Sequence, residues 1–281
     1  MPASSPTQSK PTLPTYFIPH GGGPCFFMDW TMGPADSWDS MAAWLKQLPE
    51  SIGAVPKAIL VISGHWESDI VSLTSHPKPE LIYDYSGFPA HTYQLTWPAP
   101  GAPELAAQIQ TLLQAAGIPA RLDPERGFDH GVFIPFKLVF PTAEIPTIAL
   151  SLRADLDPAF HLRLGQALAP LREQGVLIIG SGMSYHNLRA FGPAGTAASQ
   201  QFDVWLSEAL QQPATDREQA LSHWAEAPAA RRAHPREEHL LPLMVVAGAA
   251  GADPAEKVYS DEVMGLTLSA WRFGDSPQPK A

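Results

Sequence analysis

Residues 57–63, "KAILVIS", form a continuous apolar run that predicts a buried β-strand. Residues 175–182, "GVLIIGSG", have the same character, and amphipathic segments separate such runs. One of these, "PELAAQIQTLLQAAG" at 103–117, begins at a proline and ends at a glycine, as helices often do. Buried strands that alternate with helices indicate a single α/β domain with a mostly parallel, mixed sheet flanked by helices. The other predicted strands are 15–19, 69–74 (exposed), 146–152 and 266–273, and the other predicted helices are 36–48, 158–173, 197–212, 215–226 and about 235–250.

Composition narrows the class of protein. The chain has 281 residues and a net charge of −10 without any basic run, which argues against nucleic-acid binding. Its single cysteine, Cys25, allows no intramolecular disulfide. We find neither a secretory signal nor an apolar run of the ~20 residues that a membrane span needs. We therefore expect a cytoplasmic protein with a disordered tail at 1–13, one catalytic domain at 14–273 and a short tail at 274–281.

Three histidines follow predicted strands. His20 comes directly after residues 15–19, His65 follows "ILVISG", and His186 follows "VLIIGSGMSY". In open α/β sheets ligands bind at the carboxyl edge of the strands. A histidine with a purely structural role can lie anywhere in a fold, so three at this edge predict a shared site.

Two further histidines are candidates for that site. His239 comes just before "LLPLMVVAGAA", so we expect it to face inward at the start of a helix. His130 lies in "RGFDHGVFIP", which we expect to be a loop, and Asp129 beside it could orient an imidazole ring. The remaining polar residues near these motifs are expected on the solvated surface: His234, Glu237 and Glu238 as helix-capping charges, and His76, His91, His161 and His223.

The stretch "PHGGGP" at 19–24 fits two chemistries. An HGGG turn can form the oxyanion hole of a hydrolase, but such an enzyme also needs a G-x-S-x-G elbow. The closest match is "GMSYH" at 182–186, where a histidine replaces the second glycine, so Ser184 is a weak nucleophile candidate. Alternatively His20, His65 and His239 could bind one metal ion and leave coordination positions open, as catalytic sites do. The sequence favours this mononuclear catalytic metal site.

Seven ordered motifs carry a resemblance to a known family: "FIPHGGGP", "ILVISGHWE", "IYDYSGFPAHTYQLTWPAPG", "RGFDHGVFIPFKLVFP", "IPTIALSL", "GSGMSYHNL" and "HPREEHLLPLMVVAGAAG". Together they resemble the DODA-type branch of the class III, LigB-like extradiol ring-cleavage dioxygenases. The resemblance implies a LigB-like fold, iron(II) for activity with zinc possible at the same site, and a DOPA-like or other catechol plus O2 as substrates. It also implies the residue roles: His20, His65 and His239 as metal ligands, His186 as catalytic base and His130 as a second active-site histidine.

The sequence departs from that family after His20. The family more often has a short "HGSP"-like turn where this chain has "HGGGPCFFMDW", so we expect this segment, including Phe26, to line the pocket and set substrate preference. Tyr185 and Tyr93 are further candidates for substrate contacts, although packed aromatics are more common. A non-catalytic binding protein with the same fold is a third alternative, which the presence of all three ligands and His186 disfavours. The sequence does not indicate an oligomeric state.

Overall fold

The computed structural model describes residues 12–276. Most of the predicted tails, 1–11 and 277–281, lie outside this range, and Leu13 at its start is already buried. The strands are β1 (Thr15–Pro19), β2 (Ala58–Ser68), β3 (Val71–Thr74), β4 (Ala120–Asp123), β5 (Thr147–Arg153), β6 (Val176–Gly182), β7 (Ala255–Val263) and β8 (Leu266–Phe273). The α-helices are α1 (Asp39–Ile52), α2 (Pro103–Ala115), α3 (His130–Val139), α4 (Pro158–Leu168), α5 (Thr196–Leu210), α6 (Ala214–Ser222), α7 (Ala230–Ala233) and α8 (Leu241–Ala250).

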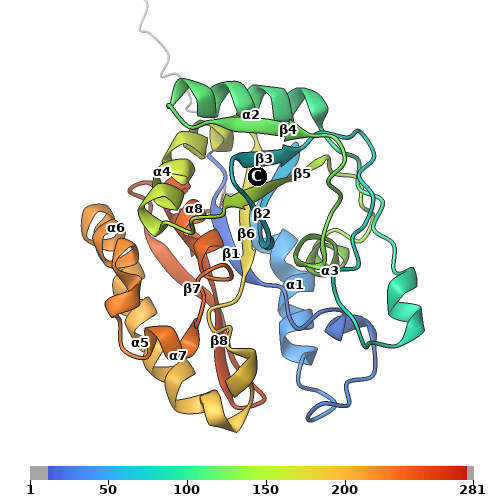
Figure 1. The fold of residues 1–281 in the computed structure, drawn as a ribbon, viewed down its shortest axis with the longest axis vertical. Helices are drawn as coiled ribbons and strands as arrows, with labels where there is room; N and C mark the ends of the chain where they lie inside the picture. Colours follow the sequence, from blue (N-terminus) through green and yellow to red (C-terminus); the bar gives the residue numbers. More distant parts are fainter. Residues whose placement is uncertain (1–11, 277–281) are drawn as a thin grey trace, which may run out of the picture.

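The eight strands form one mixed sheet in the order β4-β3-β5-β2-β6-β1-β8-β7 (Figure 1). The central strands β5, β2, β6 and β1 are parallel, because helical connections link them. β8 and β7 form an antiparallel hairpin that extends the sheet beside β1. The predicted α/β class with a mostly parallel, mixed sheet is confirmed.

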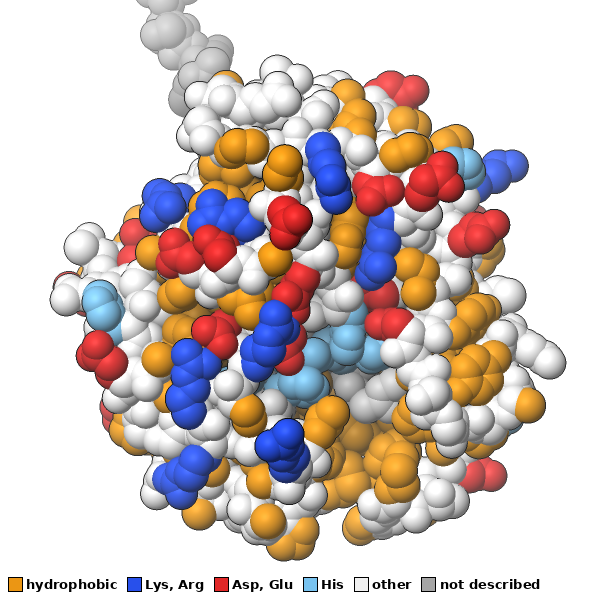
Figure 2. Space-filling view, in the orientation of Figure 1, with side chains coloured by type: hydrophobic (Ala, Val, Ile, Leu, Met, Phe, Trp, Pro, Cys, Tyr) orange, Lys and Arg blue, Asp and Glu red, His pale blue; other side chains and the backbone are white. Residues whose placement is uncertain are grey.

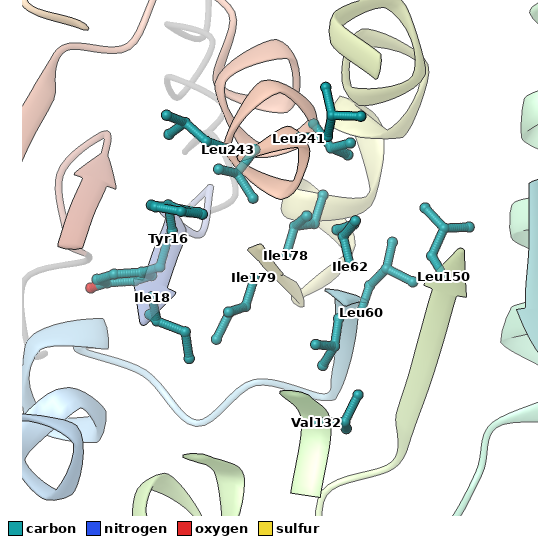
Figure 3. Close-up of a cluster of buried hydrophobic side chains, with 14 of the residues drawn as sticks. Tyr16, Ile18, Leu60, Ile62, Val132, Leu150, Ile178, Ile179, Leu241 and Leu243 are labelled. Carbon is teal, nitrogen blue, oxygen red and sulfur yellow. The ribbon is translucent and has the colours of Figure 1, made fainter. Parts of the chain in front are cut away.

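Helices cover both faces of the sheet, as Figure 1 shows, with α1 and α3 on one side and α4 and α8 on the other. In the core, Leu241 and Leu243 of α8 pack over the central strands, while Val132 of α3 lies on the opposite side (Figure 3). All ten residues of α8 are buried, so this helix has no solvated face. Within the described residues, no helix is long and apolar enough to cross a membrane.

Several predicted elements have different bounds or surroundings. The predicted exposed strand 69–74 is buried as β3, because β4 and β5 flank it on both sides. The strands β4 and β7 were not predicted, since the first is short and the second is largely polar. α1 continues through Pro49 to Ile52, and β2 runs beyond residue 63 to Ser68.

The two largest differences concern the histidine motifs. The segment 126–135, expected as a loop, contains the start of α3 at His130, and burial of this helix on nearly all sides removes the amphipathic pattern that identifies a helix. The last predicted helix begins at Leu241 instead of residue 235, with Pro242 in its first turn. Residues 235–240 consequently form an irregular turn in which His239 is buried.

Candidate metal and catalytic site

The parallel strands bring the predicted histidines to one edge of the sheet. His20 follows the last residue of β1, and its backbone N–H donates to the carbonyl of Gly182 at the end of β6 (3.3 Å). His186 lies four residues beyond β6. His65 lies within β2, where the pairing with β5 shifts its register between Ile62 and Glu67. In Figure 2, histidine side chains form the floor of a hollow, with hydrophobic side chains beside it.

The turn that carries His239 rests on two glycines. A Cβ atom at Gly182 would lie 2.1 Å from the carbonyl oxygen of His239, and one at Gly64 would lie 3.3 Å from its Cα. The backbone of this turn also accepts a hydrogen bond from the N–H of Met183 (3.0 Å). The absence of a side chain at both glycines therefore lets the turn approach β2 and β6 closely.

Three imidazole rings converge through one nitrogen each. The Nε2 atom of His65 lies 3.1 Å from Nε2 of His20 and 3.2 Å from Nε2 of His239. Neighbouring ligands that bind one metal at about 2.0–2.1 Å are separated by roughly 2.8–3.0 Å in octahedral and roughly 3.3–3.4 Å in tetrahedral geometry. The separations of His20 and His239 from His65 therefore fit ligands of one metal ion.

The outer nitrogens of the same rings have partners that fix their orientation. Nδ1 of His20 lies 3.1 Å from Oγ of Ser181, Nδ1 of His239 lies 3.1 Å from Oε1 of Glu238, and Nδ1 of His65 lies 3.6 Å from Oδ2 of Asp84. An acceptor at Nδ1 places the proton there and leaves the Nε2 lone pair free. These partners therefore favour the tautomer in which all three Nε2 atoms can bind a metal.

Burial keeps the three rings neutral. It lowers the pKa of His20 well below 6.5, and the neighbouring rings of His65 and His239 lower it further. The pKa of His65 is lowered well below 6.5 for the same reasons, with His130 as its main neighbour. Burial lowers the pKa of His239 to about 4, although contact with Glu238 opposes the shift. Neutral imidazole is the form that binds metals, so this electrostatic environment suits a metal site at neutral pH.

His186 lies beside these rings in a different arrangement. Its ring stacks on that of His239, with centroids 3.4 Å apart and planes 15° apart. Its Nδ1 lies 3.4 Å from Oε1 of Glu238, and its side chain is 19% exposed. Burial raises the pKa of Glu238, but contacts with His186 and His239 outweigh burial and lower it. Glu238, expected on the solvated surface, is therefore an ionised carboxylate shared by two site histidines.

His130, the first residue of α3, is held by a carboxylate that the sequence did not single out. Oδ1 of Asp84 accepts hydrogen bonds from Nδ1 (2.8 Å) and from the backbone N–H (2.9 Å) of His130. Asp129, which was expected to orient a ring, instead accepts from the hydroxyl of Ser63 (2.7 Å) and from Arg126 (2.9 Å). The interpretation of Asp129 as a ring-orienting group was wrong; Asp84 has that position.

Two groups of side chains have the spacing of metal ligands. The ligand-capable atoms of His20, His65 and His130 all lie within 4.8 Å of one another, and so do those of His186, Glu238 and His239. The first group contains two of the histidines whose Nε2 atoms converge, His20 and His65, and the second contains the third, His239. His130 is consequently an alternative to His239 as the third ligand.

The histidines form one end of a cavity of about 970 Å³. Its wall includes Trp30, Trp38, Tyr85, Phe88 and Met264. From the segment "CFFMDW", only Trp30 is among the described residues that line this cavity. The segment expected to determine substrate preference therefore contributes one side chain directly.

The three aromatic residues predicted to contact substrate stand behind this wall. Tyr185 is fully buried, and its hydroxyl donates to the carbonyl of Ala190 (3.0 Å). Tyr93 packs on Tyr85 with ring centroids 5.2 Å apart, and Phe26 packs on Trp38 at 6.1 Å. None of the three is among the described residues that line the cavity. All three therefore have the positions of packed aromatic side chains behind the cavity lining.

The features that a serine hydrolase requires are engaged elsewhere. Oγ of Ser184 accepts from the backbone N–H of Ser269 (2.9 Å), and the side chain is buried away from the cavity lining. The backbone N–H of Gly22 lies 3.3 Å from Sγ of Cys25 and donates to it. The glycines of the HGGG turn do line the cavity. They border the histidine cluster and place no side chain in the space beside it.

Other histidines differ from expectation in burial. His161 and His234 were expected to be solvated, yet both are fully buried. His161 donates through Nδ1 to the carbonyl of Asp157 (2.7 Å) and accepts the backbone N–H of Arg153 (3.1 Å) through Nε2. His161 therefore fixes the start of α4 against the end of β5, and His234 contacts the carbonyl of Ser184 (3.0 Å).

The carboxyl edge of this α/β sheet carries converging imidazoles beside a cavity, the place where open-sheet enzymes bind their ligands, and these rings form a candidate metal site. Residues 14–271 match the family described as the catalytic LigB subunit of aromatic ring-opening dioxygenase. The chain belongs to this family, within the DODA-type class III extradiol dioxygenases, and is an oxidoreductase that opens aromatic rings with O2.

Individual relatives cover most of the chain. A protein from Beta vulgaris named 4,5-DOPA dioxygenase extradiol is 41% identical over 241 residues, which are 84% of this chain and 87% of that protein. One of the same name from Portulaca grandiflora is 42% identical over 73% of this chain and 77% of its own length. The crystal structure of an uncharacterized protein from Escherichia coli K12 has a TM-score of 0.74 at 28% identity, covering 93% of this chain and 100% of that one.

Proposed function

We propose that this protein is an iron(II)-dependent dioxygenase that opens a catechol ring by extradiol cleavage and incorporates both atoms of O2. The convergence of the Nε2 atoms of His20, His65 and His239 carries the proposal. Three protein ligands leave coordination positions open, as catalytic sites require. The names of the relatives from Beta vulgaris and Portulaca grandiflora support a catechol as substrate.

The donor set is compatible with more than one metal. Imidazole suits iron and zinc alike, but zinc has no redox chemistry. Ring opening with O2 requires electrons to pass from the aromatic ring to oxygen, so we assign iron(II) to the working enzyme and zinc to an inactive form of the same site. His20, His65 and His239 would hold the iron, which would supply Lewis-acid activation of the diol and a path for electrons from the ring to O2.

The protein residues supply orientation and proton transfer. His186 has Glu238 beside its Nδ1, which favours a proton on that nitrogen and leaves Nε2 free to accept one from a catechol hydroxyl. His130 donates a hydrogen bond from its Nδ1–H to Asp84. It also lines the cavity, where it can hydrogen-bond to the substrate hydroxyl or to O2. The aromatic side chains of the wall line the same cavity as the histidines and would pack against a bound substrate. Tyr93 and Phe26 support that wall through Tyr85 and Trp38, and Tyr185 supports it through the Leu188–Ala190 turn.

Reconstitution with iron(II) in the absence of oxygen, followed by a panel of catechols, tests the function. We expect a yellow ring-opened product to form once air is admitted. His186→Ala should retain the metal and lose 10²–10⁴-fold in turnover, the usual contribution of a general base. The exposed His223 provides a matched control, since His223→Ala should leave turnover unchanged. Full activity of His186→Ala would contradict the assigned role.

A further inference from the structure

The cavity has two chemically different ends. The inner end consists of the histidines and Asp84, whereas the outer wall is apolar, with Trp30, Trp38, Phe88, Met264 and Leu188 among its residues. A volume of about 970 Å³ is near the top of the ~300–1,000 Å³ range of pockets that hold drug-sized ligands. A catechol ring at the histidine end would therefore leave most of the cavity for a substituent on the ring.

The outer wall offers no counter-charge for an anion. Among the described residues that line the cavity none is lysine or arginine, and its two acidic residues are Asp84 and Glu262. Asp84 is bonded to His130, while Glu262 lies on β7 at the outer end. A carboxylate in this space would lose water without gaining a partner and would face a like charge, both of which are unfavourable.

Two arginines that contact residues of the histidine cluster are already paired with carboxylates. Arg236 contacts Glu238 but forms a two-point ion pair with Glu67, with Nη2 2.5 Å from Oε2. Arg126 donates to Asp129 (2.9 Å). The net charge of −10 also provides no long-range attraction for an anionic substrate.

We infer that this enzyme prefers catechols with a bulky, apolar and uncharged substituent over catechols whose substituent carries a carboxylate. The inference rests on the proposed catechol cleavage and adds the substrate class. The diol is the part of the substrate that the histidine end recognises. The apolar wall recognises the substituent through buried area, and the missing cation discriminates against acids.

Matched substrates test the charge requirement directly. We would compare kcat/KM of the iron-reconstituted enzyme for 3-(3,4-dihydroxyphenyl)propanoate and for its methyl ester, with unsubstituted catechol as reference. The ester should exceed the acid by roughly tenfold or more. Longer alkyl esters should gain up to about fourfold per methylene until the wall is filled. Equal values for acid and ester would overturn the inference while leaving the proposed function intact, whereas cleavage of no catechol at all would refute both.

A charge placed in the wall gives an independent readout. Leu188 lines the cavity and is 73% exposed, so its replacement is compatible with folding. Leu188→Arg should raise the acid-to-ester ratio of kcat/KM several-fold, and Leu188→Glu should lower it. Val55, which is 87% exposed and lies outside the cavity lining, provides the control Val55→Arg, which should leave the ratio unchanged. An unchanged ratio in both Leu188 variants would overturn the assignment of this wall to the substituent.

Discussion

Ser181 links a proposed metal ligand to the first turn of α3. Its hydroxyl oxygen lies 3.1 Å from Nδ1 of His20, and its hydroxyl donates to the carbonyl of Gly131. In a regular helix that carbonyl would accept the N–H of residue 135, but residue 135 is a proline and has none. The serine hydroxyl therefore replaces the missing helical donor and, at the same time, accepts a hydrogen bond from the Nδ1–H of His20.

Ser181→Ala should produce two separable losses. It leaves the Gly131 carbonyl and the His20 N–H without partners in a fully buried place. Each unsatisfied group costs roughly 1–3 kcal/mol, so the free energy of unfolding of the metal-free protein should fall by about 2–6 kcal/mol. In addition, loss of the partner that orients a ligand typically weakens metal binding 10–100-fold.

Two measurements separate these effects. Urea unfolding of the metal-free protein reports stability, and competition with a chromogenic chelator for iron(II) or zinc reports metal affinity. Ser184→Ala is the matched control, because this buried serine accepts only the N–H of Ser269 among the contacts described. The control should lose stability and keep its metal affinity. Wild-type metal affinity in Ser181→Ala would refute the argument that Ser181 orients His20.

Two further predictions concern histidines. If His239 completes the metal site, His239→Ala should lose the metal while His130→Ala retains it and loses turnover; metal analysis showing the reverse would assign His130 as third ligand. Burial lowers the pKa of His161 to about 4 in the folded protein, whereas the unfolded chain has the ordinary value of 6.5. As pH falls below 6.5, the unfolded chain therefore binds the proton first, which destabilises the native state. Between pH 7 and 5 this group should cost about 2 kcal/mol in unfolding free energy, a dependence that urea titrations of His161→Gln should lack.

The sequence predicts those parts of the site that depend on regular structure. His20 and His186 follow strands whose apolar runs are unambiguous, and the carboxyl ends of parallel strands meet at one edge. Knowledge of the strand pattern is therefore sufficient to bring these residues together. The same reasoning finds His65. β2, however, does not end before this residue, because a register shift lets the strand pair with β5 again at Glu67. The apolar run alone does not predict such a shift.

The residues that orient the histidines could not be found in this way. Asp84 lies outside the regular elements, so its approach to His130 depends on the path of the whole segment between β3 and α2. Glu238 was placed on the wrong side because a helix was expected from residue 235. Since Pro242 occupies the first turn of α8, the preceding residues form a turn that directs Glu238 and His239 inward.

The position of the carboxylates explains how one cluster can combine ligands and a base. Glu238 contacts Nδ1 of both His239 and His186, so one turn orients both the proposed ligand and the proposed proton acceptor. Asp84 likewise serves two rings, since it accepts a hydrogen bond from Nδ1 of His130 and lies 3.6 Å from Nδ1 of His65. Because both carboxylates stand behind the rings instead of among the converging nitrogens, the proposed ligand set of His20, His65 and His239 is uncharged. A divalent metal held there would keep its full charge toward the cavity, which favours a catecholate. The negative charge that compensates it lies on the far side of the imidazoles, where it also raises their basicity.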